Sequence, residues 1–456
     1  MKFKNKYNLN SLLIHSWDKF QNTLSQHNGL VLLALLMGVI SVRLIILNLN
    51  YEIISPGDSL SYLKLGSDFA AGKGFIDPKT NLPYAYWPPG WPMIIAIIYK
   101  FFGVHTLPLR LYQAFVSALL CPGVYLLGRS IFNAGTGLLA AIFCIVYPAF
   151  LHPQMGFVNL LSDPTYQLLL VAGLLLFFRG EKIKQSYYFC GLVFGFSALV
   201  KPNGLAVPGI LILIILYQHR FKKNFFKASS LLMLGFLTAI LPWTVRNYLV
   251  LNKLVLVSTN SGVNLYVGNA NTFTNKLRQG DPFYDKIRAQ GDGYEQGQLL
   301  NRQGIKFLKD NLIHRQSIFL RKMKYHFDPF LAYKIKKGET LVTISKYNWM
   351  YVFLAPFIIL GFLIRSKDKF VLMSALFLSV NILTALVYLG DVRYRLEIEP
   401  LLIIVGCMGL TAFIRSSPLR LKFVLFWLLI NAVGGIFFPT ELPKLIMDLV
   451  PGTDPM

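Results

Sequence analysis

Two aspartates stand where polar segments meet apolar ones, and each has a side chain that can accept a proton or bind a metal ion. Asp58 lies in SPGDSLSYLKLG after the first apolar run, and Asp163 lies in NLLSDPTYQLLL at the start of a later one. Both positions also suit helix starts, where a carboxylate accepts hydrogen bonds from backbone N–H groups and Pro164 fits the first turn. From spacing alone, capping and catalysis explain Asp58 equally well, and both can hold together.

Basic side chains gather at the ends of the same apolar segments. Lys201 begins a turn, Arg246 lies in PWTVRN, and Arg393 and Arg395 stand in GDVRYRLEIEP. Each one alone is explained by a side chain that reaches out to lipid headgroups. Together they predict fixed positive charge at one mouth of the molecule, where the phosphate of a lipid could be held.

Further candidates for substrate binding are aromatic, with one histidine. Trp87 belongs to the stretch LPYAYWPPGWP, which is typical of an interfacial aromatic belt and equally suits stacking on a sugar. Tyr62 lies one helical turn after Asp58. His152 stands alone on a connecting loop, where an ordinary surface role is more common than ligand binding, and we keep it as a candidate.

Motifs for other chemistries are absent from the sequence. It has no Walker A loop, no G-x-G-x-x-G that opens a helix, no H-E-x-x-H and no G-x-S-x-G. A cytoplasmic nucleotide site is therefore not expected, and any energy must arrive with the substrate. All four cysteines fall in apolar runs, which is typical of small buried residues rather than of disulfides or a thiolate metal site.

The composition is that of a membrane protein. Of the 456 residues 54% are hydrophobic and 14% are charged, and the mean hydropathy is +0.51, whereas about a quarter of the residues are charged in soluble domains. The net charge of +24 is then expected from membrane topology and anionic headgroups. No nucleic-acid partner is expected.

The apolar runs predict an all-α polytopic protein with about eleven crossings, since a crossing takes about 20 residues. The run at 93–102 is too short to cross and predicts a re-entrant or interfacial helix. The predicted spans are 29–49, 111–131, 134–151, 158–179, 186–200, 203–218, 228–249, 347–364, 370–389, 397–415 and 419–438.

Lys and Arg in the short loops predict a cytoplasmic N-terminus and an outer C-terminus. The expected location is the plasma (inner) membrane, with the polar masses and the active site on the extracytoplasmic side. This one-sided arrangement favours chemistry at one face over alternating access. The expected parts are a cytoplasmic amphipathic segment (1–28), a catalytic membrane module (29–249) with a first outer loop (50–110), an extracytoplasmic region (250–346), further spans (347–439) and an outer tail (440–456).

Several stretches resemble one family of membrane enzymes. They are GDSLSYLKLGSDFAAGKGF, WPPGWPMIIAIIYKFFG, GLVFGFSALVKPNGLAVP, PWTVRNYLVLNKLVLVSTNSGVNLYVGN and RYRLEIEPLL. They are similar to bacterial family-39-like glycosyltransferases of the GT-C superfold, which are relatives of the protein O-mannosyltransferases and the lipid A aminoarabinose transferases. The resemblance implies a GT-C-type helical bundle. It also implies transfer of a sugar from a polyprenyl-phosphate donor in the bilayer to an acceptor that is a protein, a lipid or a glycan.

The resemblance also implies roles for residues. Asp58 matches the acidic residue of the first loop that is expected as catalytic base, and Asp163 falls where relatives carry an acid in the second outer loop. Arg246 and the Arg393–Tyr394–Arg395 cluster stand where phosphate-holding residues are expected.

Two departures from the family pattern bear on the choice of acceptor. Ser59 follows Asp58 where protein mannosyltransferases commonly pair two acids, and Trp87 stands where Arg is frequent. One base and a cationic clamp, with attack from the opposite side of the sugar, predict inversion at the anomeric carbon. The resemblance leaves room for a divalent cation in place of Arg, but the sequence shows no compact cluster of ligands that would assign one.

Three other functions explain part of this pattern. A transporter or flippase of lipid-linked saccharides would place charged residues inside the spans, and apart from Arg43 the spans are nearly free of them. An O-antigen polymerase or ligase shares the outward-facing lipid-phosphate chemistry but does not account for Asp58 or the WPPGWP turn. A non-catalytic membrane scaffold is the remaining alternative.

Overall fold

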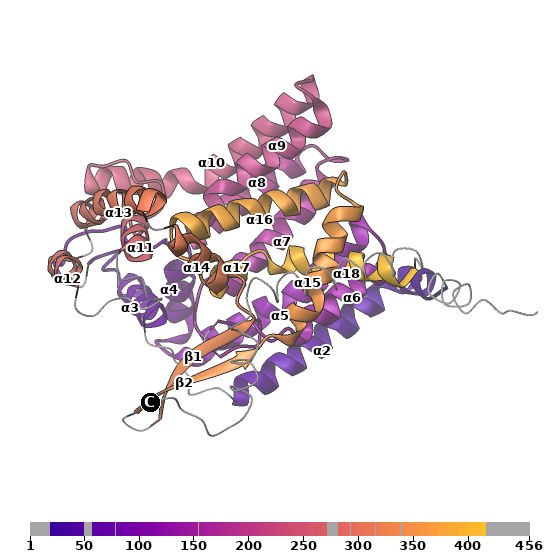
Figure 1. Ribbon diagram of the computed structural model, residues 1–456, viewed down its shortest axis with the longest axis horizontal. Helices are drawn as coiled ribbons and strands as arrows, with labels where there is room; N and C mark the ends of the chain where they lie inside the picture. The colour runs from indigo at the N-terminus through magenta and orange to yellow at the C-terminus, as the bar shows by residue number, and fades with distance from the viewer. Residues whose placement is uncertain are drawn as a thin grey trace, which may run out of the picture.

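The computed structural model describes residues 19–49, 57–77, 79–153, 155–270, 281–291, 293–314, 316–337 and 340–415, and these are mostly helical. Figure 1 shows α11, α12 and α13 gathered at one end of the molecule, beyond the ends of α10 and α16, with the two strands below them. The elements are α2 (Asn28–Leu49), α3 (Asp58–Ala70), α4 (Gly90–Phe102), α5 (Thr106–Ile131), α6 (Ala134–Val146), α7 (Asp163–Arg179), α8 (Ser186–Val200), η1 (Pro202–Ala206), α9 (Val207–His219), α10 (Lys223–Leu251), α11 (Ser261–Asn269), α12 (Pro282–Ala289), α13 (Tyr294–His314), α14 (Ser317–His326), β1 (Phe330–Lys337), β2 (Thr340–Tyr347), α15 (Trp349–Ile364), α16 (Lys369–Val387), α17 (Val392–Arg395) and α18 (Glu399–Arg415).

Helices cover ten of the eleven predicted spans, and the short helix predicted at 93–102 is α4. Within the described residues, five helical segments are long and apolar enough to cross a membrane: α2, α5, η1 with α9, α10 and α16. Four more helices are apolar but shorter, namely α4, α6, α8 and α15. The last predicted span, 419–438, lies outside the described residues, as does most of the predicted N-terminal segment.

Two of the predicted spans, 134–151 and 158–179, are wrong in extent. α6 ends at Val146 and α7 begins at Asp163, with a loop of turns between them. Pro148 lacks the N–H that would continue α6, and Pro164 suits the first turn of α7. Asp163 therefore stands at the junction of a loop and a helix.

Side chains from three helices hold this second loop in place just before Asp163. The indole of Trp91 in α4 donates to the Leu160 carbonyl at 3.0 Å, and the amide of Gln113 in α5 donates to the Leu161 carbonyl at 2.6 Å. From α3, the Ser59 hydroxyl bonds to the Asn159 side chain at 2.7 Å. Buried carbonyls of an irregular loop need such partners, and these contacts fix the loop against α3, the helix that begins at Asp58.

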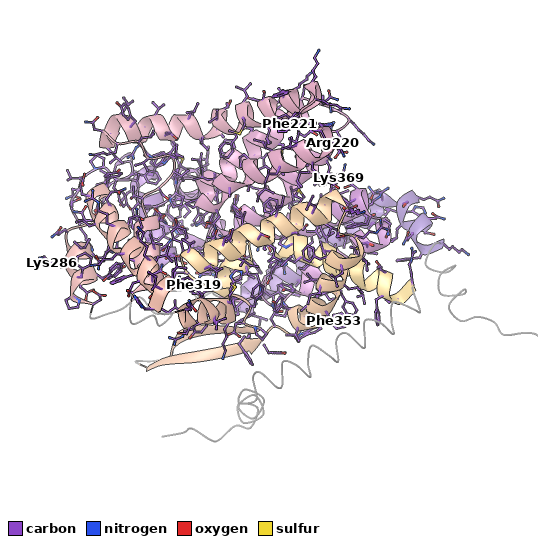
Figure 2. All side chains as sticks on the ribbon, turned by 45° about the horizontal axis from the view of Figure 1, so that its top comes forward. Arg220, Phe221, Lys286, Phe319, Phe353 and Lys369 are labelled. Atoms are coloured by element: carbon purple, nitrogen blue, oxygen red, sulfur yellow. The ribbon has the colours of Figure 1, made fainter. Side chains whose placement is uncertain are left out.

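The loops predicted to be cytoplasmic lie together at the end of the bundle away from α12, the helix that carries Lys286 (Figure 2). Glu181, just after α7, accepts a hydrogen bond from Gln218 at the end of α9 at 3.2 Å and pairs with Lys369 at the start of α16. In Figure 2, Arg220, Phe221 and Lys369 lie at the end away from Lys286. The structure thus places these loops together, and the side of the membrane that they face stays a prediction.

A β-hairpin departs from the all-helical prediction. β1 and β2 pair antiparallel over their whole length, with Phe330 opposite Tyr347 and Lys337 opposite Thr340. The basic stretch 301–327, within the predicted extracytoplasmic region, forms most of α13 and all of α14.

α8 and α10 pack closely through a reciprocal pair of glycines. A Cβ on Gly191 would lie 1.9 Å from the Leu232 carbonyl oxygen, and one on Gly235 would lie 1.9 Å from the Tyr188 oxygen. Neither position tolerates a side chain, so the two backbones can be in contact. This packing fixes the position of α8, and Lys201 directly follows the last residue of that helix.

Arg43 in α2 is fully buried and has a structural role. Its guanidinium donates to the Ser117 hydroxyl at 3.0 Å and to the carbonyls of Ile145 and Cys144 at 2.9 and 3.2 Å. These carbonyls belong to the last turn of α6, where the helix leaves its own acceptors unpaired. These contacts account for Arg43, a charged residue inside the first predicted span, without a transport role.

Replacing Arg43 with Leu is expected to lower the thermal midpoint of the detergent-purified protein. Hydrogen bonds to charged groups contribute about 1.5–3 kcal/mol, and the buried carbonyls of α6 would lose their partner. Thermal denaturation followed by intrinsic fluorescence measures the change, with Leu44→Ala, on an exposed side chain of the same helix, as the control. Equal midpoints for the two variants would contradict the structural role.

Candidate active site

Asp58 is the first residue of α3, and the preceding residue, Gly57, occupies the N-cap position. Gly57 has φ of 106°, a conformation that side chains rarely adopt. Within the described structure the Asp58 carboxylate makes no capping bond and instead accepts from Arg393 Nη1 at 2.7 Å. The capping explanation is therefore wrong for Asp58, whose side chain is 41% exposed.

Asp163 lies against the same arginine from the other side. Its carboxylate is buried and accepts from Arg393 Nη2 and Nε at 3.1 and 3.2 Å and from Lys201 at 2.6 Å. Ser162 is the N-cap position of α7, so the Asp163 side chain is also available for ion pairing rather than capping. One guanidinium thus bridges carboxylates from the first and second loops.

Arg393 is aimed by the short helix α17. The Asp391 side chain accepts from the backbone N–H of Arg393 at 2.8 Å and so caps that turn. Burial lowers the pKa of the Arg393 guanidinium, but Asp163 and Asp58 outweigh burial and raise it well above its usual value. Arg393 is a permanent cation between two acids.

Lys201 forms a second bridge, and this one includes a residue that sequence reasoning missed. Its ammonium contacts Asp163 at 2.6 Å and Glu397 at 2.8 Å. Glu397 also accepts two bonds from the amide of Asn203, at 3.0 and 2.9 Å. Burial lowers the pKa of Lys201, yet the carboxylates raise it overall. An acid at the edge of the apolar run in RYRLEIEPLL was the signal available for Glu397.

A cavity of about 850 Å³ opens beside these ion pairs. Its charged lining residues, among those that the structure describes, are Asp58, Lys201, Asp391, Arg393 and Glu397. An apolar stretch of lining comes from η1, α9 and α16, with Leu205, Val207, Ile210, Phe377 and Val380. A mainly apolar pocket with a few convergent polar groups is the usual form of a small-molecule site.

The structure brings most of the predicted site residues to this cavity. Tyr62, Trp87 and Tyr394 line it together with Asp58, Lys201 and Arg393. The rings of Tyr62 and Trp87 lie 4.9 Å apart, and Lys201 lies 5.7 Å from the ring of Tyr394. Asp163 lies directly behind the lining, in contact with both cations.

Arg246 is not among the residues that line the cavity. Its guanidinium donates to the carbonyls of Tyr84 and Phe75 at 3.0 and 3.3 Å and lies 4.8 Å from the ring of Trp243. It thereby holds the loop that contains Phe75 and Tyr84 against α10. Its contacts differ from the phosphate contact that the resemblance implies.

Arg395 and His152 also lie away from the cavity lining. Arg395 is fully buried, pairs with Glu399 at 2.9 Å and stacks 3.7 Å from the ring of Tyr351. The His152 ring donates from Nε2 to the Leu331 carbonyl at 3.3 Å, and burial lowers the pKa of its imidazole to about 4. His152 thus contacts the β-hairpin, and Arg395 joins α17 to α14, α15 and α18.

Comparison with protein-family models gives one match. Residues 87–244 match the family described as dolichyl-phosphate-mannose-protein mannosyltransferase, and this segment contains Trp87, Asp163 and Lys201. None of the curated proteins compared with the chain matches it.

Comparison with solved structures finds membrane glycosyltransferases. The oligosaccharyltransferase of Archaeoglobus fulgidus in its apo form has a TM-score of 0.53 at 13% identity, over 88% of this chain and 52% of that one. The same enzyme, AglB, with an inhibitory peptide and a dolichol-phosphate has a TM-score of 0.51 at 12% identity, over 95% and 53%. ArnT from Cupriavidus metallidurans with undecaprenyl phosphate has a TM-score of 0.41 at 15% identity, over 82% and 77%.

The present chain spans about half the length of the oligosaccharyltransferase that it matches. The likeness nevertheless covers most of this chain. The chain therefore has the GT-C fold of membrane glycosyltransferases, and its residues 87–244 match the mannosyltransferase model.

Proposed function

We propose that this protein is an integral membrane glycosyltransferase. It transfers a sugar from a polyprenyl-phosphate donor to an acceptor at the extracytoplasmic face, with Asp58 as general base. The observation that carries the proposal is the position of Asp58, which lines a large cavity. Its carboxylate lies 2.7 Å from Arg393, a cation to which a phosphate can bind. The proposal places the isoprenoid chain along the apolar lining from α9 and α16.

The chemistry needs a base and a place for negative charge. Asp58 takes the proton of the acceptor hydroxyl as its oxygen forms a bond with the anomeric carbon. The bond from that carbon to the phosphate oxygen breaks, and its electron pair leaves with the polyprenyl phosphate. Arg393 and Lys201 stabilise that charge, which is the largest electrostatic contribution available here. Attack opposite to the leaving phosphate inverts the anomeric carbon.

The charges of the site imply an exchange of partners when the donor binds. Three carboxylates, Asp58, Asp163 and Glu397, share the two cations Lys201 and Arg393. A donor phosphate that binds Arg393 must displace one of the carboxylates paired with it. Asp58 is the accessible one, while Asp163 is buried. Donor binding thus releases Asp58 from its ion pair and leaves it ready to accept a proton.

The residues do not fit a divalent cation. The solved oligosaccharyltransferase was also crystallised with zinc and sulfate, which raises the question for this chain. Among its described residues, no group of three His, Cys, Asp or Glu side chains could hold a metal ion. Arg393 already bridges the two carboxylates that would be shared by such an ion. We therefore derive no step through a metal.

Chelation of divalent cations is accordingly expected to leave the transfer rate unchanged. The purified enzyme is assayed before and after dialysis against EDTA, with addition of Mg²⁺, Mn²⁺ or Zn²⁺ as a second arm. A loss of activity on chelation, restored by one metal, would contradict the assignment of the bridging role to Arg393.

The proposed function is tested with purified protein in detergent and a panel of polyprenyl-phosphate sugars. Consumption of a donor and release of free polyprenyl phosphate, with membrane extract as acceptor, would support it and name the sugar. Failure to consume any donor by folded protein would overturn it.

A further inference from the structure

The cavity has a second wall that is distant in sequence from the ion pairs. Among the described residues of 254–301, sixteen line the cavity and none of these is charged. The polar members that carry side-chain amides are Asn260 and Asn264, at the start of α11 and within it, and Gln298 and Asn301 in α13. We call the side chains of Asn264, Gln298 and Asn301 the amide wall.

The uncharged and the charged residues of α13 lie on different faces of the helix. The residues that it presents to the cavity are Tyr294, Gly297, Gln298 and Asn301, whose spacing follows one face of a helix. Its charged residues Glu295, Arg302, Lys306, Lys309 and Asp310 are exposed instead. The next residue, Arg302, is a cation, but it is exposed and does not line the cavity. The cavity has the uncharged amide of Asn301 instead.

The amides of this wall are not used to hold the fold together. Within the described residues, the side chains of Asn264, Gln298 and Asn301 have no hydrogen-bond partner in the protein. In contrast, the side-chain amides of two neighbouring buried asparagines donate to backbone carbonyls: Asn269 donates to the Val387 carbonyl at 2.8 Å and Asn311 to the Asn269 carbonyl at 2.8 Å. The amide wall therefore offers unused donors and acceptors to whatever fills the cavity.

The helices that carry the amide wall pack closely together and are joined to the side of the cavity that holds Asp58. A Cβ on Gly262 would lie 2.1 Å from the Gly297 carbonyl oxygen, so α11 and α13 are in backbone contact. The backbone N–H of Thr259 donates to the Ala85 carbonyl at 2.9 Å. This bond ties the wall to the stretch that carries Trp87, which packs on Tyr62 one turn from Asp58.

We infer that the amide wall binds an uncharged, hydroxyl-rich acceptor, a saccharide, and that this inference rests on the function proposed above. An amide donates and accepts at once, as a sugar hydroxyl does, and Trp87 and Tyr294 offer aromatic surface beside it. Since the acceptor must reach the base, a wall joined to the Asp58 side suits the acceptor. Pockets of roughly 300–1,000 Å³ hold drug-sized ligands, so 850 Å³ leaves room beyond the donor's sugar phosphate.

An anionic acceptor fits this wall poorly. A phosphorylated glycolipid would lie against amides while the basic residues of α13 point away from it. Phosphate recognition calls for Arg or Lys, and the two cations at the cavity are already committed to the donor phosphate.

The test uses the full-length protein in detergent, with Asn264→Leu and Asn301→Leu as variants and Gln296→Leu as the control. Gln296 is an amide of the same helix that does not line the cavity. The first readout is binding without donor: millimolar neutral oligosaccharides of glucose, mannose or N-acetylglucosamine should raise the thermal midpoint of the wild type. The shift should shrink in both variants and persist in the control.

The second readout is kinetic and separates acceptor from donor. With an accepted oligosaccharide, each variant should raise the acceptor KM roughly two- to ten-fold, with a much smaller change in donor KM. A rise confined to donor KM would assign the wall to the donor sugar and overturn the inference. Turnover with only a Ser/Thr peptide or a phosphorylated glycolipid would also overturn it. Oligosaccharide binding without consumption of any donor would instead support the wall and overturn only the transferase function.

Discussion

Asp58→Asn is expected to lower the rate of sugar transfer by about 10²–10⁴, the usual contribution of a general base. The substitution keeps the size and the acceptor oxygen of the side chain but removes its capacity to take a proton. Because Asp58 is half-exposed and does not cap α3, the fold should tolerate the change. The measurement is the release of free polyprenyl phosphate and of glycosylated product, with wild-type and variant protein in the same detergent.

The matched control is Asp68→Asn, ten residues further along α3. Asp68 pairs with Lys64 and Lys73 on the surface and does not line the cavity. It should leave the transfer rate near that of the wild type, and both variants should keep the wild-type thermal midpoint. If Asp58→Asn retained full activity, the base would have to be sought elsewhere around the cavity.

Much of the fold could be predicted from the sequence because the bilayer leaves few choices. Long apolar runs must be helical in lipid, since every backbone polar group needs an internal partner, and ten of the predicted spans are helices. The ends were harder to predict. Between Val146 and Asp163 the chain stays largely apolar although it is not helical, so hydropathy alone extends both spans into the loop.

The hairpin had a signal that helical spacing obscured. FLAYKIKKGETLVTISKY alternates polar and apolar residues on both sides of KGET, a pattern of period two that is typical of paired strands. The neighbouring basic stretch 301–327 is helical, and Pro329, which cannot continue a helix, separates it from the first strand.

The residues of the site could be predicted from the sequence, but the ion-pair and hydrogen-bond partners of each residue could not. Asp58, Asp163, Lys201 and Arg393 each stand at a predicted loop, and the structure joins them in two bridges. Arg246 looks equivalent in the sequence, yet it bonds to carbonyls of a loop more than 160 positions away. Contacts between distant backbone atoms leave no local pattern, so a structural arginine and a substrate-binding one cannot be told apart by spacing.

Arg393→Gln is expected to lower transfer by about 10²–10³, the usual cost of losing one donor that stabilises a developing anion. It should also destabilise the protein. Asp163 is buried, and removing a partner from a buried ion pair costs about 3–5 kcal/mol. Donor consumption and the thermal midpoint are measured on the same preparation. A variant with unchanged donor KM and unchanged rate would contradict the phosphate contact.

The double variant Arg393→Gln/Asp163→Asn separates the two effects. It removes the buried carboxylate together with its cation, so the thermal midpoint should recover towards that of the wild type, because no uncompensated charge is left behind. Transfer should not recover, since the cation that holds the leaving phosphate is still missing. Recovery of both would mean that Arg393 acts only by stabilising the fold, and recovery of neither would mean that Asp163 stabilises the fold beyond its pairing with Arg393.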